Sequence, residues 1–161
     1  MKFRMVDRIL DWQSRRSITG LKTVSFEEYC LKSAFGGEAC LPESLLMEGL
    51  FQLGNWLIML SSDFEQMGLL VRVEEMIFRE QLKPGQKLRM EVNVVSYRGD
   101  GISFDGKAIV GDREIASGRG CLATPVALAD FHNPEDLKVL FSEIYRPPEK
   151  GLKLGISNGP A

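Results

Sequence analysis

The chain has 161 residues, 44% of them hydrophobic and 26% charged, and a formal net charge of -2. This length suits one domain with a substantial core, and the composition is that of an ordinary globular protein. Neither the charge nor any run of lysine and arginine favours a nucleic-acid partner. Because the chain has a single histidine, His132, and no CxxC pair, we expect no metal site and no cofactor.

The cysteines and the first residues favour a soluble protein of the cytoplasm. Cys30, Cys40 and Cys121 form an odd, scattered set, which suits reduced thiols better than disulfides. Cys40 precedes the longest apolar stretch, so a reactive thiol there stays open beside the commoner case of an inert, buried one. The opening MKFRMVDRILDW alternates charged and apolar residues, unlike a signal peptide.

Two short strands are expected before the first long helix. Residues 6–12 and 17–25 alternate apolar and polar side chains, and the polar residues 14–16 separate them as a turn. Residues 26–37 have no clean period and end in two glycines, which predicts an irregular loop. Pro42 and Glu43 then mark a helix start, and this helix is predicted to run to about Gln66, where Gly68 ends it.

The apolar run 45–60 carries only three clearly polar side chains, Glu48, Gln52 and Asn55. Steps of four and three residues place them on one face of a helix whose other faces are apolar or glycine. Such a helix is buried, so a carboxylate on it is costly unless it is paired, solvated through a cleft or kept for chemistry. The run is shorter than the roughly 20 residues that span a bilayer, and its acid argues against membrane insertion.

The other residues of this helix each allow two interpretations. Gln52 and Asn55 are expected to hydrogen-bond Glu48 or the backbone in preference to a substrate. Gly49 and Gly54 are interpreted as positions of close packing in preference to ligand contacts. The apolar side chains form either the core or the wall of a ligand tunnel, and the sequence does not separate these two roles.

The second half is rich in strands joined by short turns. Alternation predicts strands at 69–78, 88–97, 102–110 and 114–123, and the short connections make them antiparallel. With the first two strands they give an α+β layout, in which one curved antiparallel sheet wraps a long central helix. We therefore expect one domain over residues 1–124.

The composition changes after Pro125. Asn133 and Pro134 have the pattern of a capped helix start. We predict an extension over residues 125–148 with one amphipathic helix, followed by a flexible tail over 149–161. The apolar stripe of this helix consists of Leu137, Leu140, Phe141 and Ile144.

Several segments carry a resemblance to a known family. Residues 5–11 (MVDRILD) and 24–28 (VSFEE) are similar to its first strands, and 83–86 (KPGQ) to one of its turns. Residues 33–42 (SAFGGEACLP) and 45–52 (LLMEGLFQ) are similar to its active-site loop and helix, with the pattern GHFPGxPxxPG and then an acid with a glutamine four residues later. Over residues 3–124 the chain resembles the FabZ/FabA-like hotdog fold of the 3-hydroxyacyl-[acyl-carrier-protein] dehydratases of fatty-acid synthesis.

The resemblance implies a reaction and a site. Such dehydratases remove water from a 3-hydroxyacyl thioester: a histidine takes a proton from the α-carbon, and an acid on the central helix helps to expel the hydroxyl. Backbone N–H groups of the loop and of the helix start hold the thioester carbonyl. Glu48 matches the acid. The positions matched to substrate binding are Phe35, Gly36, Gly37, Cys40, Pro42 and Gln52.

One position departs from the family pattern. Ala34 stands where the catalytic histidine is expected, and alanine cannot accept a proton. Losing a general base costs about 10²- to 10⁴-fold in rate, so dehydratase activity is expected to be impaired. Three functions compete. The first is an enzyme that uses Glu48 with another base: a dehydratase, an isomerase or a hotdog thioesterase. The second is a non-catalytic acyl-binding or structural subunit, and the third is a partner of a histidine-bearing dehydratase in a mixed dimer.

The resemblance also implies partners. One is an acyl carrier protein, or coenzyme A, that carries the acyl chain. Another is a second copy of the chain, because the family builds each site from two subunits. Five basic residues offer either a surface for an acidic carrier or only a solvated face, and these are Arg72, Arg79, Lys83, Lys87 and Arg89.

Overall fold

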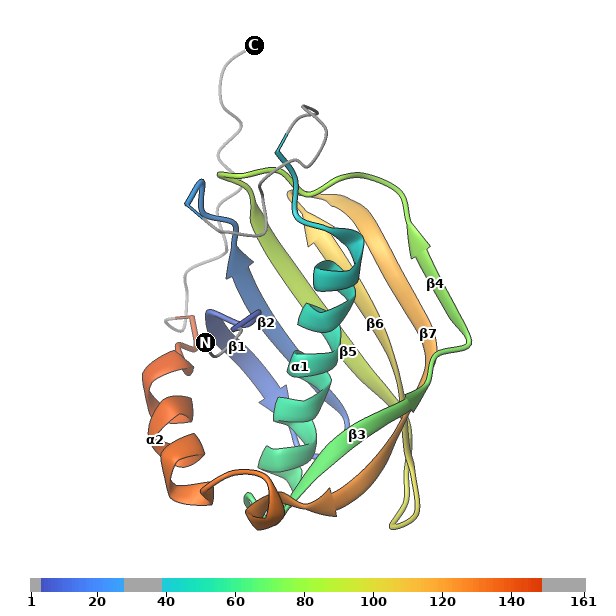
Figure 1. Cartoon of the computed structure of the whole chain (residues 1–161), viewed down its shortest axis with the longest axis vertical. Helices are drawn as coiled ribbons and strands as arrows, with labels where there is room; N and C mark the ends of the chain where they lie inside the picture. Colours follow the sequence, from blue (N-terminus) through green and yellow to red (C-terminus); the bar gives the residue numbers. More distant parts are fainter. Residues whose placement is uncertain (1–3, 28–38, 149–161) are drawn as a thin grey trace.

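Residues 4–27 and 39–148, which the computed structural model describes, form a curved sheet that wraps one long helix (Figure 1). The seven strands run in the order β1-β2-β5-β6-β7-β3, with β4 also paired to β7, and every pair is antiparallel. This confirms the predicted α+β layout. The strands are β1 (Arg8–Gln13), β2 (Ser17–Thr23), β3 (Gln66–Arg72), β4 (Glu75–Phe78), β5 (Lys87–Tyr97), β6 (Ile102–Val110) and β7 (Arg113–Ala127).

Helix α1 (Glu43–Ser61) is buried against the sheet because one side of it is purely aliphatic. Leu46, Leu50, Leu53 and Leu57 follow helical spacing, and each is at most 2% exposed. Full burial of one such side chain is worth about 1.5–3 kcal/mol. Among the described residues, no helix is both long enough and apolar enough to cross a membrane.

Glycines let this helix lie close to the strands. A Cβ added at Gly54 would lie 2.9 Å from the tip of the Phe104 ring on β6, and one at Gly20 would lie 2.7 Å from a methyl group of Leu53. At Gly49 the nearest atom would be the Met90 sulfur, at 3.1 Å. The interpretation of Gly49 and Gly54 as close-packing positions therefore agrees with the structure.

The helix ends earlier than the sequence predicts. Helix α1 stops at Ser61, and Gln66, the predicted last residue, already begins β3. The Ser62 hydroxyl donates to the Ile58 carbonyl and accepts the Gln66 N–H, which closes a tight turn. Asp63 and Phe64 in this turn have positive φ angles of 51° and 62°. Burial of the Phe64 side chain, which is 8% exposed, favours this backbone.

The predicted strand 69–78 is two strands. Strands β3 and β4 pair with different parts of β7, on either side of a bulge at Gly120, whose φ is 59°. The Asp105 carboxylate accepts the Gly120 N–H at 2.9 Å, so the bulge leaves no unpaired donor there. A bulge bends its strand, and the chain between β3 and β4 follows that bend at Glu74.

The extension after the sheet packs on α1. Strand β7 continues to Ala127, three residues past the expected domain end at 124, and the short 3₁₀ turn η2 (Leu128–Asp130) leads to helix α2 (Pro134–Ile144). Asn133 caps α2 by accepting the Glu135 N–H at 3.0 Å, as its sequence pattern predicts. The Phe141 ring lies 6.2 Å from Trp56 of α1, and the Arg146 N–H donates to the Ile9 carbonyl on β1.

Replacing Gly54 with valine is expected to lower the free energy of unfolding by about 1–3 kcal/mol, because the new side chain must displace the Phe104 ring. Helix propensity would not cause this loss, since valine is a slightly better helix former than glycine. Urea denaturation at one fixed protein concentration measures the effect. Gly99→Val is the control, because nothing lies within 4 Å of a Cβ there. Equal losses in both variants would contradict the close-contact account.

Candidate functional site

The polar line of α1 faces away from the sheet. At about 100° per residue, Glu48, Gln52 and Asn55 lie on the side of the helix opposite the buried leucines. The helix start is fixed by the Leu41 N–H, which donates to the Leu82 carbonyl at 2.7 Å. Pro42 precedes the first turn and supplies no side-chain cap. The acid is therefore carried by a rigid element on the face that the core leaves open.

Gln52 fixes the Glu48 carboxylate. The Gln52 Oε1 accepts the Met5 N–H at 2.9 Å, and a backbone N–H can only donate. The Gln52 amide is thereby oriented so that its Nε2 donates to Glu48 Oε1 at 2.8 Å. Within residues 4–27 and 39–148 the half-buried Glu48 has this one hydrogen-bond partner and no ion pair. This excludes the simple alternative of an acid neutralised by a described arginine.

Asn55 joins the helix to the edge of the sheet. Its Oδ1 accepts the Gly68 N–H of β3 at 2.8 Å. Gly68 allows this approach, because a Cβ there would lie 2.6 Å from Ile58 and 3.0 Å from Ala123. Both amides therefore hydrogen-bond Glu48 or the backbone, as expected, and contact of Gln52 with a substrate stays a prediction.

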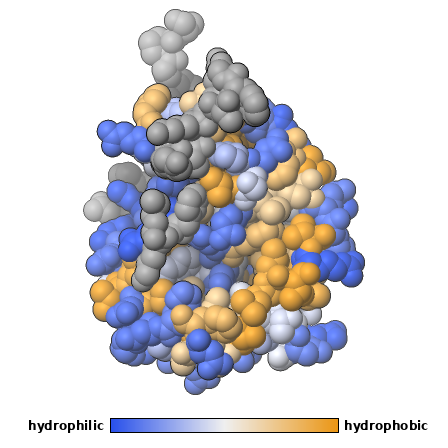
Figure 2. All heavy atoms as spheres, viewed as in Figure 1, coloured by the Kyte–Doolittle hydropathy of each residue, from blue (hydrophilic) through white to orange (hydrophobic). Residues whose placement is uncertain are grey.

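Glu48 lines a pocket between α1 and β3, which we call the acid pocket. Its volume is about 180 Å³. In Figure 2 the exposed side of α1 is polar, and hydrophobic surface gathers beside it over β3 and β4. A carboxylate with one oxygen held by an amide can exchange a proton with a molecule bound there. The pocket is lined by Glu48, Phe51, Gln52, Asn55, Ile58, Gly68, Leu69, Leu70, Phe104 and Ala123.

The structure brings together only some of the predicted site residues. Glu48 and Gln52 both line the acid pocket. Cys40 is half-buried and Pro42 is exposed, and both lie at the start of α1, outside the pocket lining. The remaining predicted positions, Ala34, Phe35, Gly36 and Gly37, lie outside the described residues.

The apolar wall of the acid pocket could not be identified from sequence. Phe51 and Ile58 line it, and Ile58 also belongs to the core, whereas the neighbouring Leu50 and Leu57 belong to the core alone. All four have the same chemical character, so only the rotation of the helix against the sheet separates them. An approximate signal exists in the angular distance from Glu48, because Phe51 lies within about 60° of it on the helix.

The described thiols and potential metal ligands form no second reaction centre. Burial raises the pKa of the Cys121 thiol to about 11, with a smaller contribution from Asp105, so this cysteine stays protonated near neutral pH. A role for Cys40 stays a prediction. No group of three potential metal ligands occurs in the described part of the chain.

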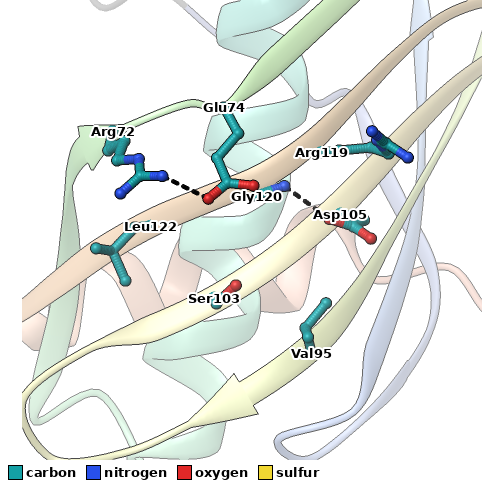
Figure 3. A pocket seen from close by; sticks show the side chains of 8 residues that line it. All are labelled: Arg72, Glu74, Val95, Ser103, Asp105, Arg119, Gly120 and Leu122. Carbon is teal, nitrogen blue, oxygen red and sulfur yellow. Dashed lines mark hydrogen bonds and ion pairs between the residues drawn. The ribbon is translucent and has the colours of Figure 1, made fainter.

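A wider hollow of about 480 Å³ lies on the outer face of the sheet (Figure 3). Ser103 and Asp105 reach it because they alternate with Phe104, which faces α1. Its charges are already paired: Arg72 contacts Glu74 at 2.6 Å, and Asp105 holds the bulge. The described residues of this hollow therefore differ from those of the acid pocket, where the Glu48 carboxylate has no ion pair with a described residue.

The predicted basic surface is also largely neutralised. Arg72, Arg79 and Arg89 each form an ion pair with a nearby glutamate. Exposed pairs of this kind contribute little stability, but they reduce the local positive potential. These ion pairs therefore account for the three arginines without a carrier protein as their partner.

Solved structures share this fold at low sequence identity. A Streptococcus mutans protein bound to acetyl CoA matches with a TM-score of 0.60 and 11% identity, over 74% of this chain and 88% of that one. The fluoroacetyl-CoA thioesterase FlK, a mutant solved with fluoro-acetate, matches with a TM-score of 0.63 and 14% identity, over 81% and 98% of the two chains. At these identities the likeness supports the hotdog fold alone.

Curated relatives are closer in sequence. The 3-hydroxyacyl-[acyl-carrier-protein] dehydratase FabZ of Caulobacter sp. is 35% identical over 117 residues, covering 71% of this chain and 72% of the relative. That of Moorella thermoacetica is 32% identical over 117 residues, covering 72% and 82%. Residues 1–119 match the FabA-like domain. The chain therefore belongs to the FabA-like domain family.

Proposed function

We propose that this protein binds acyl thioesters, carried on acyl carrier protein or coenzyme A, as a dehydratase-like member of fatty-acid or related acyl-chain biosynthesis. The observation that carries the proposal is the half-buried Glu48 carboxylate, which has no ion pair among the described residues and is held by Gln52 in an otherwise largely apolar pocket. The names of the relatives agree with this substrate class. We place the activity in the cytoplasm, in keeping with the reduced thiols expected of the scattered cysteines.

In a dehydration, Glu48 would donate a proton to the departing 3-hydroxyl, which leaves as water while the double bond forms. A base must take the proton from the α-carbon. Ala34 occupies the position at which the family pattern has its histidine, so this half of the chemistry lacks its usual group. We infer that the protein alone is a weak dehydratase at most, and that Glu48 retains its acid role.

A second copy of the chain would complete the pocket. The outer edge of β3 pairs with no described strand, and Leu69, Leu70 and Val71 along it are 40%, 37% and 58% exposed. An open hydrophobic edge favours pairing with another strand. Leu69 and Leu70 also line the acid pocket, so a partner seated on this edge would form part of the pocket wall.

The missing base supports an alternative. If each site takes its histidine from one subunit and its acid from the other, this chain would supply Glu48 to a histidine-bearing partner in a mixed dimer. The same residues also allow a purely acyl-binding subunit or a hotdog thioesterase. The absence of a histidine at position 34 favours the mixed dimer among these.

Titration of the purified protein with acyl-CoA and acyl-carrier thioesters of several chain lengths tests the proposal. Phe51→Ala is expected to weaken binding by about ten- to a hundredfold, because it removes an apolar wall of the pocket. Phe131→Ala is the matched control, since Phe131 is 54% exposed and lies outside the acid pocket. No binding by the unaltered protein, or equal weakening in both variants, would overturn the proposal.

Introducing a base at position 34 is expected to raise hydratase activity. Ala34→His should raise the hydration rate of a 2-enoyl thioester by about tenfold or more, in line with the contribution of a general base. Adding Glu48→Gln should remove that gain, because glutamine cannot supply the proton. Rates from the change in enoyl absorbance measure both effects. A gain that survives Glu48→Gln would contradict the acid role of Glu48.

Sedimentation velocity tests the subunit arrangement. We expect the unaltered chain to sediment as a dimer and Val71→Lys to shift it towards monomer, because a charge would be buried on the β3 edge. Val95→Lys is the control, since Val95 is 66% exposed on the outer face of the sheet. A monomeric unaltered chain would contradict pairing through this edge.

A further inference from the structure

A second apolar pocket lies between α1 and α2, and we call it the α2 chamber. Its volume is about 360 Å³, within the range of small-molecule sites. The described residues that line it include no acid, and Arg4 and His132 are its charged or titratable members. Its apolar lining includes Trp56, Met59, Met67, Leu137, Leu140 and Ile144.

The chamber and the acid pocket adjoin along α1. Gln52 and Asn55 line both of them. At about 100° per residue, Phe51 and Ile58 lie on one flank of these two amides and Trp56 lies on the other, while Met59 continues the line of the amides. Gln52 and Asn55 thus form a ridge between the two pockets. Their hydrogen bonds to the N–H groups of Met5 and Gly68 hold this ridge in place. A molecule that starts beside Glu48 reaches the chamber by crossing the ridge.

Helix α2 forms one wall of the α2 chamber. Leu137, Leu140 and Ile144 form its outer wall, and they lie beyond residues 1–119, the part that matches the FabA-like domain. The helix is tied down at both ends: the Leu128 N–H donates to the Glu65 carbonyl before it, and the Arg146 N–H to the Ile9 carbonyl after it. The wall therefore lies outside the part of the chain that matches the family domain.

We propose that the α2 chamber receives the alkyl tail of the acyl group whose thioester lies beside Glu48, and that α2 sets the chain length accepted. This proposal rests on the proposed function. Burial of methylene groups supplies the affinity, and the long, flexible side chains of Met59 and Met67 can adapt to tails of different length. The absence of acids suits an uncharged tail, and the shared ridge joins the chamber to the reacting end of the ligand.

Filling the chamber tests this inference. Leu140→Trp should weaken binding of hexadecanoyl-CoA by about tenfold or more, because it removes space for the tail. Binding of butanoyl-CoA, which is too short to need the chamber, should be unchanged. Val139→Trp is the matched control on the same helix, since Val139 is 59% exposed and does not line the chamber. Calorimetric titration measures all these affinities.

Fluorescence quenching tests the same inference without a substitution in the chamber lining. The chain has two tryptophans, so a Trp12→Phe protein reports on Trp56 alone. Hexadecanoyl-CoA brominated near the end of its tail should quench this fluorescence, and unbrominated hexadecanoyl-CoA should not. This result stands even where Leu140→Trp fails to fold.

The outcomes separate the two proposals. Failure of both ligands to bind the unaltered protein would overturn the proposed function, and the chamber assignment with it. Binding of both ligands without quenching by the brominated tail, or with unchanged hexadecanoyl-CoA affinity in a folded Leu140→Trp protein, would overturn the chamber assignment alone. Quenching together with selective loss of the long chain supports it.

Discussion

The Glu48 carboxylate in the largely apolar middle of helix α1 is the constraint on which this structure depends. Leaving a charge partly out of water costs several kcal/mol unless other groups stabilise it. Among the described residues this stabilisation is small, because it consists of one amide hydrogen bond, from Gln52, beside a pocket of about 180 Å³. The core is built by the opposite side of the same helix, so α1 is at once the centre of the fold and the wall of the site.

The face that carries Glu48 could be predicted from sequence because helix periodicity alone determines it. Glu48, Gln52 and Asn55 share that face in the structure, and the two amides hold Glu48 and β3 as expected. The strand alternation and the short connections likewise predicted the antiparallel sheet. These features depend on local spacing and on the polar or apolar character of each side chain.

Features set by contacts between distant residues could not be predicted in this way. The helix end depends on the Ser62 hydroxyl and on burial of Phe64, and the break between β3 and β4 follows a bulge in β7, at Gly120. Phe51 lines the acid pocket and Leu50 belongs to the core, and this difference depends on how the helix is rotated against the sheet. The α2 chamber depends on the docking of α2, which is fixed by the bridge between Ile9 and Tyr145.

Of the two edges of the sheet, the β1 edge is covered and the β3 edge has no described cover. This difference links the fold to the site. The β1 edge is covered by the chain after α2, through the Ile9–Tyr145 bridge and the Arg146 N–H. The β3 edge has no described cover, and its exposed leucines are also walls of the acid pocket. An exposed hydrophobic edge invites association unless it is blocked. Among the described residues one edge is covered and the edge beside Glu48 is open, so the second subunit that we propose would contact the same strand that shapes the pocket.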